Sequence, residues 1–109
     1  MVNITINNTE NWEKLVSDNP NSLIIMFFHA TWCGPCRVLT NTIENMKGEH
    51  DDVIIAHIDV DNSDTMPMMF SIRSVPTLLF TKNGYILGRT TGVVGSNVIR
   101  EKIKEYLIK

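Results

Sequence analysis

Cysteine is scarce in this sequence. The chain of 109 residues has two, Cys33 and Cys36, three positions apart. A small fold that is stapled by disulfides needs several bridges that close longer loops. A bridge between neighbours this close adds little stability. The pair therefore indicates chemistry or a metal site rather than a structural staple.

The further ligands that a metal site on this pair would need are also missing. There is no second cysteine pair, and His29, His50 and His57 lack the histidine spacing typical of zinc sites. Covalent haem attachment needs a histidine directly after the second cysteine, where this chain has Arg37. We therefore expect no metal and no haem, and favour redox chemistry at the cysteines.

Long apolar runs and blocks of like charge are absent too. The longest apolar run, residues 23–28, is far shorter than the ~20 residues of a membrane helix, so we expect no membrane contact. The first five residues lack the basic and apolar regions of a secretory signal, which predicts a cytoplasmic protein. A net charge of −2 without a basic block argues against nucleic-acid binding. We expect residues 1–109 to form a single domain and a monomer.

Strand and helix patterns alternate along the chain. Apolar runs bounded by turn residues predict strands at residues 2–6, 23–28, 53–58, 77–80 and 85–90. Helical spacing and capping residues predict four helices: one capped by Asn8 or Thr9, one from Cys36 to near Gly48, a short irregular one at 64–70, and one capped by Ser96 or Asn97. In the last helix the residues expected to point inward are Val98, Ile99, Ile103, Tyr106 and Leu107. This order predicts an α/β fold with a mixed sheet and helices on both faces.

The cysteines lie where a predicted strand ends and a predicted helix begins. Helix N-termini have unpaired N–H groups and a partial positive charge, so we expect a lowered pKa for Cys33 and a role as nucleophile. Cys36 lies one turn further in, more buried, where it can attack a mixed disulfide and release the reduced client. Pro35 suits the first turn of a helix. Gly34 leaves the sulfur of Cys33 accessible, and Trp32 can form an apolar wall beside it.

Four short motifs together resemble the thioredoxin family over essentially the whole chain. They are Trp-Cys-Gly-Pro-Cys at residues 32–36, Val75-Pro76-Thr77, Lys82-Asn83-Gly84 and Gly92. The resemblance implies the thioredoxin fold, a central mixed five-stranded sheet flanked by four helices. It also implies a protein-disulfide reductase with no cofactor besides its redox-active disulfide. Electrons would come from a thioredoxin reductase and pass to disulfide-containing client proteins.

The resemblance further implies a client-binding surface around the cysteines. In the family a cis-proline loop, here Val75 and Pro76, lies against the active site, so the main chain of Val75 can pair with an extended client segment. We expect the surface to comprise Trp32, Gly34, Pro35, Val75, Pro76, Gly92 and Val93. Ordinary packing is the alternative interpretation of Val75 and Val93.

The chain departs from the family at a buried ion pair. Phe27 stands where the family usually has a buried aspartate, and His57 replaces its partner lysine. Losing both charges together is compatible with folding. However, the aspartate is thought to help deprotonate the second cysteine. One hypothesis is that His57 or a water accepts this proton. The alternative, which we favour from the sequence, is that His57 is only a hydrogen-bonded core residue.

Other departures and functions stay open at this point. His29, at a position that is commonly aromatic, either tunes the sulfurs or fills surface. Arg37 and Arg73 either flank the site and bias the choice of partner, or are plain surface charges, which is the simpler interpretation. A binding subunit that uses the same surface without redox turnover is the main alternative function. Gly34 and Pro35 argue against an oxidase or isomerase, because relatives with those functions generally carry other residues between the two cysteines.

Overall fold

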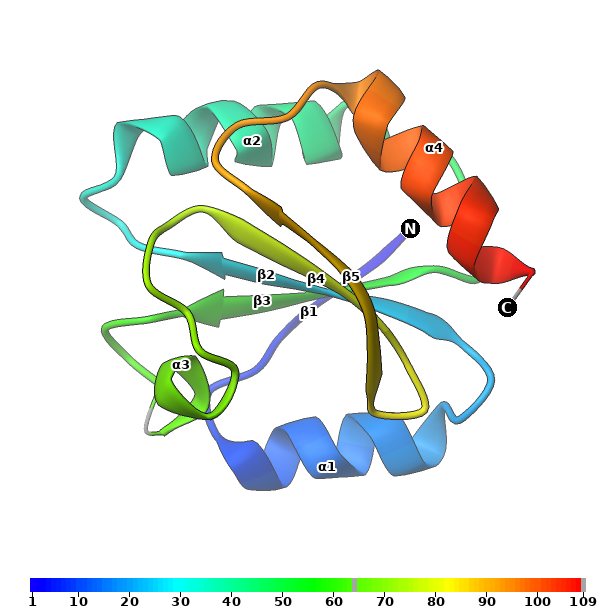
Figure 1. Cartoon of the computed structure of the whole chain (residues 1–109), viewed down its shortest axis with the longest axis horizontal. Coiled ribbons are helices and arrows are strands. Elements are labelled where there is room, and N and C mark those ends of the chain that lie inside the picture. The colour runs from blue at the N-terminus through cyan, green and yellow to red at the C-terminus, as the bar shows by residue number, and fades with distance from the viewer. Residues whose placement is uncertain (64, 109) are drawn as a thin grey trace.

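A five-stranded mixed sheet runs through the computed structural model, which describes residues 1–63 and 65–108. The elements are β1 (Val2–Thr5), α1 (Thr9–Asp18), β2 (Leu23–His29), α2 (Gly34–Glu44), β3 (Ile54–Asp59), α3 (Met66–Met69), β4 (Thr77–Lys82), β5 (Tyr85–Thr91) and α4 (Ser96–Leu107). The strands lie in the order β1-β3-β2-β4-β5 (Figure 1). Strand β3 is parallel to β1 and β2, whereas β4 is antiparallel to β2 and β5. The expected α/β fold is confirmed.

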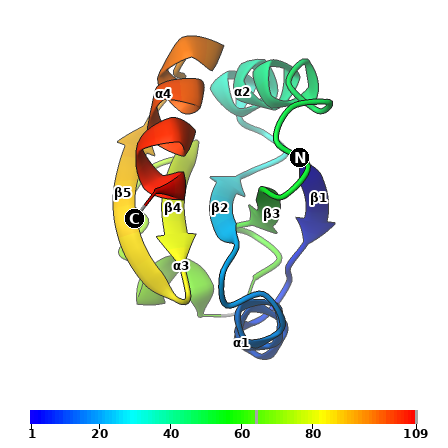
Figure 2. The ribbon, with the colours of Figure 1, turned by 90° about the vertical axis from the view of Figure 1, so that its right-hand side faces the viewer.

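Helices cover both faces of the sheet. Figures 1 and 2 show α2 and α4 on one face and α1 and α3 on the other. The first six residues of β2 are buried, as the apolar run predicts for a central strand. Its odd-numbered residues 23–27 pack with Leu39 of α2 and Ile103 of α4. Its even-numbered residues 24–28 pack with Trp12 of α1 and Met66 of α3.

The topology brings three connections together at one end of the strands, the end at which β2 finishes. Strand β2 ends at His29, and α2 begins a few residues later. Because β4 is antiparallel to β2 and pairs Thr77 with Phe28, the loop before β4 lies beside the end of β2. Strand β5 pairs Thr91 with Thr77, so β5 finishes at this same end of the sheet. Segments that are far apart in the sequence therefore meet around the cysteines.

Most element predictions are confirmed within a few residues, and those for the helix ends need correction. Helix α2 ends at Glu44, and residues 45–48 form turns. The short helix is Met66–Met69, and Asp64 of its predicted range lies outside the described residues.

The prediction for the start of the last helix is wrong. Ser96 is already helical, and the N-cap residue is Gly95, without a side-chain cap hydrogen bond. The backbone carbonyl of Gly95 accepts from the N–H groups of Val98 and Ile99 instead. Val98 is also not inward: it is 41% exposed. Ile99 and the later buried residues form the inward stripe, and the residue before Ile99 is rotated away by about 100°.

Gly88 of β5 leaves room for Tyr106 of α4. A Cβ atom on Gly88 would overlap the hydroxyl and ring of Tyr106, whose ring centroid lies 5.5 Å from that of Phe80. We predict that Gly88→Ala lowers the free energy of unfolding by about 1–3 kcal/mol, because Tyr106 must leave its position. Urea denaturation measures the change. Gly48→Ala is the matched control, since a Cβ there meets no atom within 4 Å; equal stability of the two variants would contradict this packing.

Candidate active site

Cys33 and Cys36 form a disulfide at the start of α2. Cys33 is the N-cap residue, and its Sγ accepts a hydrogen bond from the backbone N–H of Cys36 at 3.2 Å. Pro35 occupies the first turn, where its missing N–H leaves no helical bond unmade. The Cys33 sulfur therefore lies at the end of the helix that has free N–H groups and partial positive charge.

The two cysteines differ little in burial. Cys33 is 5% exposed and Cys36 is 3% exposed, and both belong to a small apolar cluster with Ala30. A Cβ atom on Gly34 would meet no atom within 4 Å, so the chain beside the disulfide is open there. Because exposure does not separate the two sulfurs, any difference in their roles must follow from their positions on α2.

The loop before β4 lies against the disulfide. The carbonyl oxygen of Val75 is 3.8 Å from the Sγ of Cys33, and the peptide bond between Val75 and Pro76 is cis. The N–H of Gly92 donates to the carbonyl oxygen of Pro76 at 2.9 Å, and Gly92 has φ +81°, which favours glycine. The next residue, Val93, is 48% exposed. Residues 75–76 and 92–93 thus form one continuous border beside Cys33.

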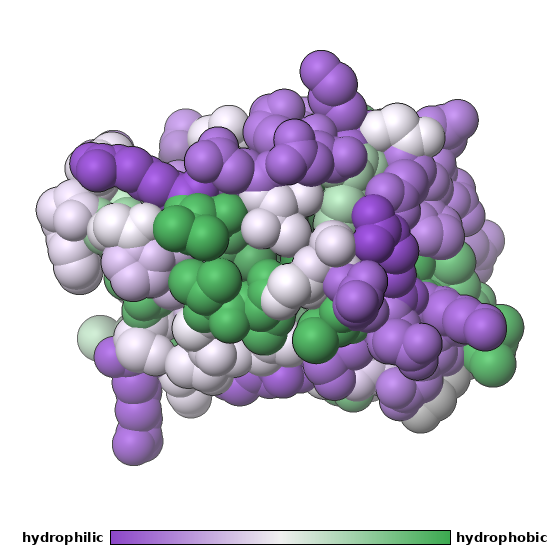
Figure 3. Space-filling model, turned by 90° about the horizontal axis from the view of Figure 1, so that it is seen from above, coloured by the Kyte–Doolittle hydropathy of each residue, from purple (hydrophilic) through white to green (hydrophobic). Residues whose placement is uncertain are grey.

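An apolar area also shows on the side of the molecule that carries α2 and α4 (Figure 3). Surface of intermediate hydropathy and, further out, hydrophilic surface border it. The exposed apolar residues on the segments of this side include Val38 of α2 and Val93 before α4. Exposed apolar patches with a polar rim are typical of surfaces that contact other proteins.

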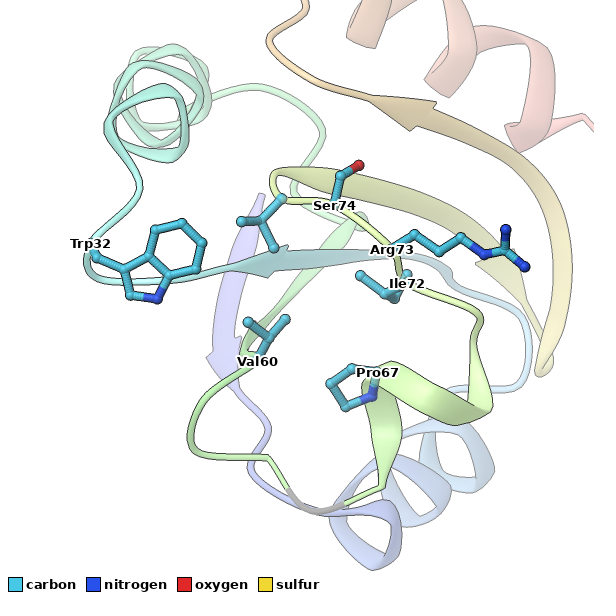
Figure 4. A pocket seen from close by; sticks show the side chains of 7 residues that line it. Trp32, Val60, Pro67, Ile72, Arg73 and Ser74 are labelled. Carbon is cyan, nitrogen blue, oxygen red and sulfur yellow. The ribbon is translucent and has the colours of Figure 1, made fainter.

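A groove of about 190 Å³ opens beside Trp32, between the segment that follows β3 and the loop that precedes β4 (Figure 4). It is lined by Trp32, Val60, Pro67, Ile72, Arg73, Ser74 and Val75. Of the residues predicted to bind clients, Trp32 and Val75 line this groove. The other five lie outside its lining: Gly34, Pro35, Pro76, Gly92 and Val93. Arg73, taken from the sequence mainly as a surface charge, is part of the groove wall.

Sequence reasoning missed Asp61, which holds the exposed indole. Trp32 is 68% exposed, yet its Nε1–H donates to Oδ2 of Asp61 at 2.8 Å. The backbone N–H of Asp61 in turn donates to Oδ1 of Asp59 at 2.9 Å. The sequence signal for these acids is their position at the end of a parallel strand, since sites in α/β folds collect at the carboxyl ends of strands: Asp59 is the last residue of β3, and Asp61 follows it.

The positions of Phe27 and His57 are neighbours across β2 and β3. The two residues pair directly in the sheet register, and their ring centroids are 5.6 Å apart. The ring of His29 lies 5.0 Å from that of Phe27 and 5.9 Å from that of His57. Nε2 of His57 lies 2.8 Å from Oδ1 of Asn3. One aromatic cluster therefore occupies the location where the resemblance implies a buried ion pair.

Comparison with known proteins identifies the family. The family model for thioredoxin matches residues 3–105. The chain belongs to the thioredoxin family. Thioredoxin-1 of Caenorhabditis elegans is 31% identical over 96 residues, which cover 88% of this chain and 83% of the relative. Thioredoxin 2 of Chlorobaculum tepidum is 33% identical over 90 residues, covering 82% and 83% of the two chains.

Solved thioredoxin structures are similar over nearly the whole chain. The X-ray structure of Fasciola hepatica thioredoxin superposes with a TM-score of 0.88 at 31% identity, covering 97% of this chain and 99% of the other. Family membership and the Cys33–Cys36 pair make this protein a thiol–disulfide oxidoreductase that reduces protein disulfides. Among residues 1–63 and 65–108, no group of three or more His, Cys, Asp or Glu side chains is placed to hold a metal ion. No helix in this part of the chain is long and apolar enough to cross a membrane.

Burial lowers the pKa of both partly buried histidines of the site below the ordinary value of 6.5. For His29, the carboxylate of Asp59 opposes the effect of burial on the pKa. For His57, the positive charge of protonated His29 lowers the pKa further, and Glu44 opposes it. Both imidazoles are therefore mainly neutral at pH 7, in a form that accepts a proton.

These lowered pKa values predict a loss of stability in mild acid. Well above pH 6.5 both histidines are neutral in the folded and the unfolded chain. As the pH falls below this value, the unfolded chain binds protons first, so the free energy of unfolding decreases until the folded-state pKa values are passed. Urea denaturation between about pH 7.5 and about pH 5 measures this decrease. The variant His29→Gln/His57→Gln should show a shallower decrease; the same slope in both proteins would contradict the lowered pKa values.

Proposed function

We propose that Cys33 is the nucleophile and Cys36 the resolving cysteine in the reduction of client disulfides. The observation that carries this assignment is the hydrogen bond from the Cys36 N–H to the Cys33 sulfur at the N-terminus of α2. A thiolate at Cys33 gains this bond and the favourable helix dipole, whereas Cys36 lies inside the helix. Cys33 is therefore the more acidic thiol and attacks first.

The reaction moves two electrons from the dithiol to the client. The Cys33 thiolate attacks one sulfur of the client disulfide, which forms a mixed disulfide and releases the other client sulfur as a thiolate. Cys36 then loses its proton and attacks the Cys33 sulfur. The Cys33–Cys36 disulfide forms, and the second client thiolate leaves. Protons from Cys36 and solvent convert the client thiolates to thiols.

Clients bind as extended segments across the border beside Cys33. The carbonyl oxygen of Val75 lies next to the Cys33 sulfur, where it can accept a hydrogen bond from a client N–H. The groove beside Trp32 has about 190 Å³, which is below the usual size of small-molecule sites and suits client side chains. Pro76, Gly92 and Val93 continue this contact surface on the other side, with Gly34 and Pro35 next to the attacking sulfur.

The electron donor in this proposal is a thioredoxin reductase. The oxidised disulfide must be reduced after each turnover, and the family implies a reductase for this step. The protein thereby carries electrons from the reductase to its clients as a monomer in a reducing compartment such as the cytoplasm. A scaffold role without redox turnover is not favoured, because the chain retains the cysteine pair in a family of reductases.

Insulin reduction with dithiothreitol as electron source tests the cysteine roles. We expect the wild type to accelerate reduction, and Cys33→Ser and Cys36→Ser to lose this activity. Reduced Cys36→Ser, freed of dithiothreitol before insulin is added, should accumulate a covalent mixed disulfide with insulin at Cys33, detected by mass spectrometry, because no resolving thiol is present. Replacing dithiothreitol by a thioredoxin reductase and NADPH then tests the donor. Full activity of Cys33→Ser would contradict the proposal.

A further inference from the structure

The imidazoles of His29 and His57 form one ring cluster with Phe27. His29 is the last residue of β2, and it contacts Phe27, which packs against Leu39 of α2. Side chains alternate along a strand, so His29 and Phe27 face the same helix. Cys36 is the first of the buried residues of α2, and α2 starts above the end of β2 (Figure 1). His29 and Cys36 are therefore at the same end of the interface between β2 and α2.

Ala30 supports this placement. It directly follows His29 and packs with Cys33 and Cys36 in one apolar cluster. The side chain of His29 thus comes from the residue adjacent to the floor of the disulfide. Phe27, at the position where the resemblance implies a buried aspartate, is fully buried and offers no base.

His57 extends the site from His29 towards the edge of the sheet. Its ring centroid is 5.9 Å from that of His29 in an edge-to-face arrangement, so the two rings are neighbours. On its other side, Nε2 lies 2.8 Å from the carbonyl oxygen of the Asn3 side chain. That oxygen can only accept, so Nε2 of His57 is the donor, and Nδ1 of the neutral ring is free to accept a proton. Asn3 is exposed on the edge strand β1, so the far end of this row is in contact with solvent.

The charges around the two rings favour a neutral pair that can be protonated transiently. The carboxylate of Asp59 on β3 acts on His29, and that of Glu44 on α2 acts on His57; both stabilise an imidazolium. Burial and the mutual repulsion of two positive rings oppose it. Asn3 on β1 and Phe27 on β2 contact the rings without adding a charge. The pair can hold one proton briefly, and the proton is not retained at neutral pH.

We propose that His29 accepts the proton of Cys36 during resolution, and that His57 passes it on to solvent at Asn3. In this step the S–H bond of Cys36 breaks and a bond from hydrogen to a His29 ring nitrogen forms. The Cys36 thiolate then displaces the client thiolate from the Cys33 sulfur. The proton leaves through His57 or returns to the client thiolate. This inference rests on the proposed roles of Cys33 and Cys36. In it, the two histidines deprotonate Cys36 in place of the buried aspartate that the family usually has at the position of Phe27.

Single-turnover reaction of the reduced protein with the aromatic disulfide 5,5′-dithiobis(2-nitrobenzoate) separates the two steps. Attack by Cys33 releases one coloured thiolate, and resolution by Cys36 releases the second, so stopped-flow absorbance follows both in one trace. We expect His29→Gln to slow the second release about 100-fold at neutral pH, as for loss of a general base, and to leave the first unchanged. His57→Gln should slow the second release by a smaller factor. His50→Asn, which removes the remaining histidine at a position with φ +50° that asparagine tolerates, should change neither release.

The pH dependence distinguishes proton transfer from a structural role. In the wild type the second release should slow as the pH falls below 6.5, and this decline should be absent in His29→Gln/His57→Gln. Circular dichroism checks folding, and His29→Asn replaces His29→Gln if the latter does not fold. A second release with the wild-type rate and pH dependence in both His29 variants would overturn this inference alone. A first release in Cys33→Ser that is as fast as in the wild type would instead overturn the proposed cysteine roles, because Cys36 alone should react far more slowly.

Discussion

The hydrogen bond from the Cys36 N–H to the Cys33 sulfur is the contact on which the site depends. The bond exists because α2 begins at this point. The helix begins here because the central strand β2, buried on both faces, ends at His29, four residues before Cys33. The antiparallel pairing of β4 with β2 brings the loop that contains Val75 to the same end of the sheet, next to Cys33. The sheet thus places a nucleophile, a resolving group and a client-binding backbone together, although they lie about forty residues apart in the chain.

The exchange of a buried ion pair for Phe27 and His57 changes the chemistry more than the fold. The two positions are direct neighbours across β2 and β3, so both charges of one pair are lost together. An apolar ring and a neutral imidazole then pack without leaving an unpaired buried charge. The cost falls on proton transfer, because Phe27 offers no base beneath Cys36. His29 and His57 supply basic ring nitrogens at this location, where the family usually has an aromatic residue and a lysine.

Much of the fold could be predicted from the sequence, because the apolar run of β2 and the turn at Asn83 and Gly84 are local signals. The cap of α4 could not, since Ser96 and Asn97 are both good capping residues and the backbone of Gly95 served instead. The same limit applies to the site. The cysteine motif was visible in the sequence, whereas the bond between Trp32 and Asp61 and the contact between His29 and His57 arise only when strands and loops are placed side by side.

The most direct test of this account is the pKa of the Cys33 thiol in the reduced protein. The rate of iodoacetamide alkylation of Cys33, followed against pH with the modified residue identified by mass spectrometry, gives this value. The account predicts a pKa clearly below the ordinary cysteine value of about 8.5, because the helix N-terminus and the Cys36 N–H stabilise the thiolate. A pKa for Cys33 at or above about 8.5 would contradict it.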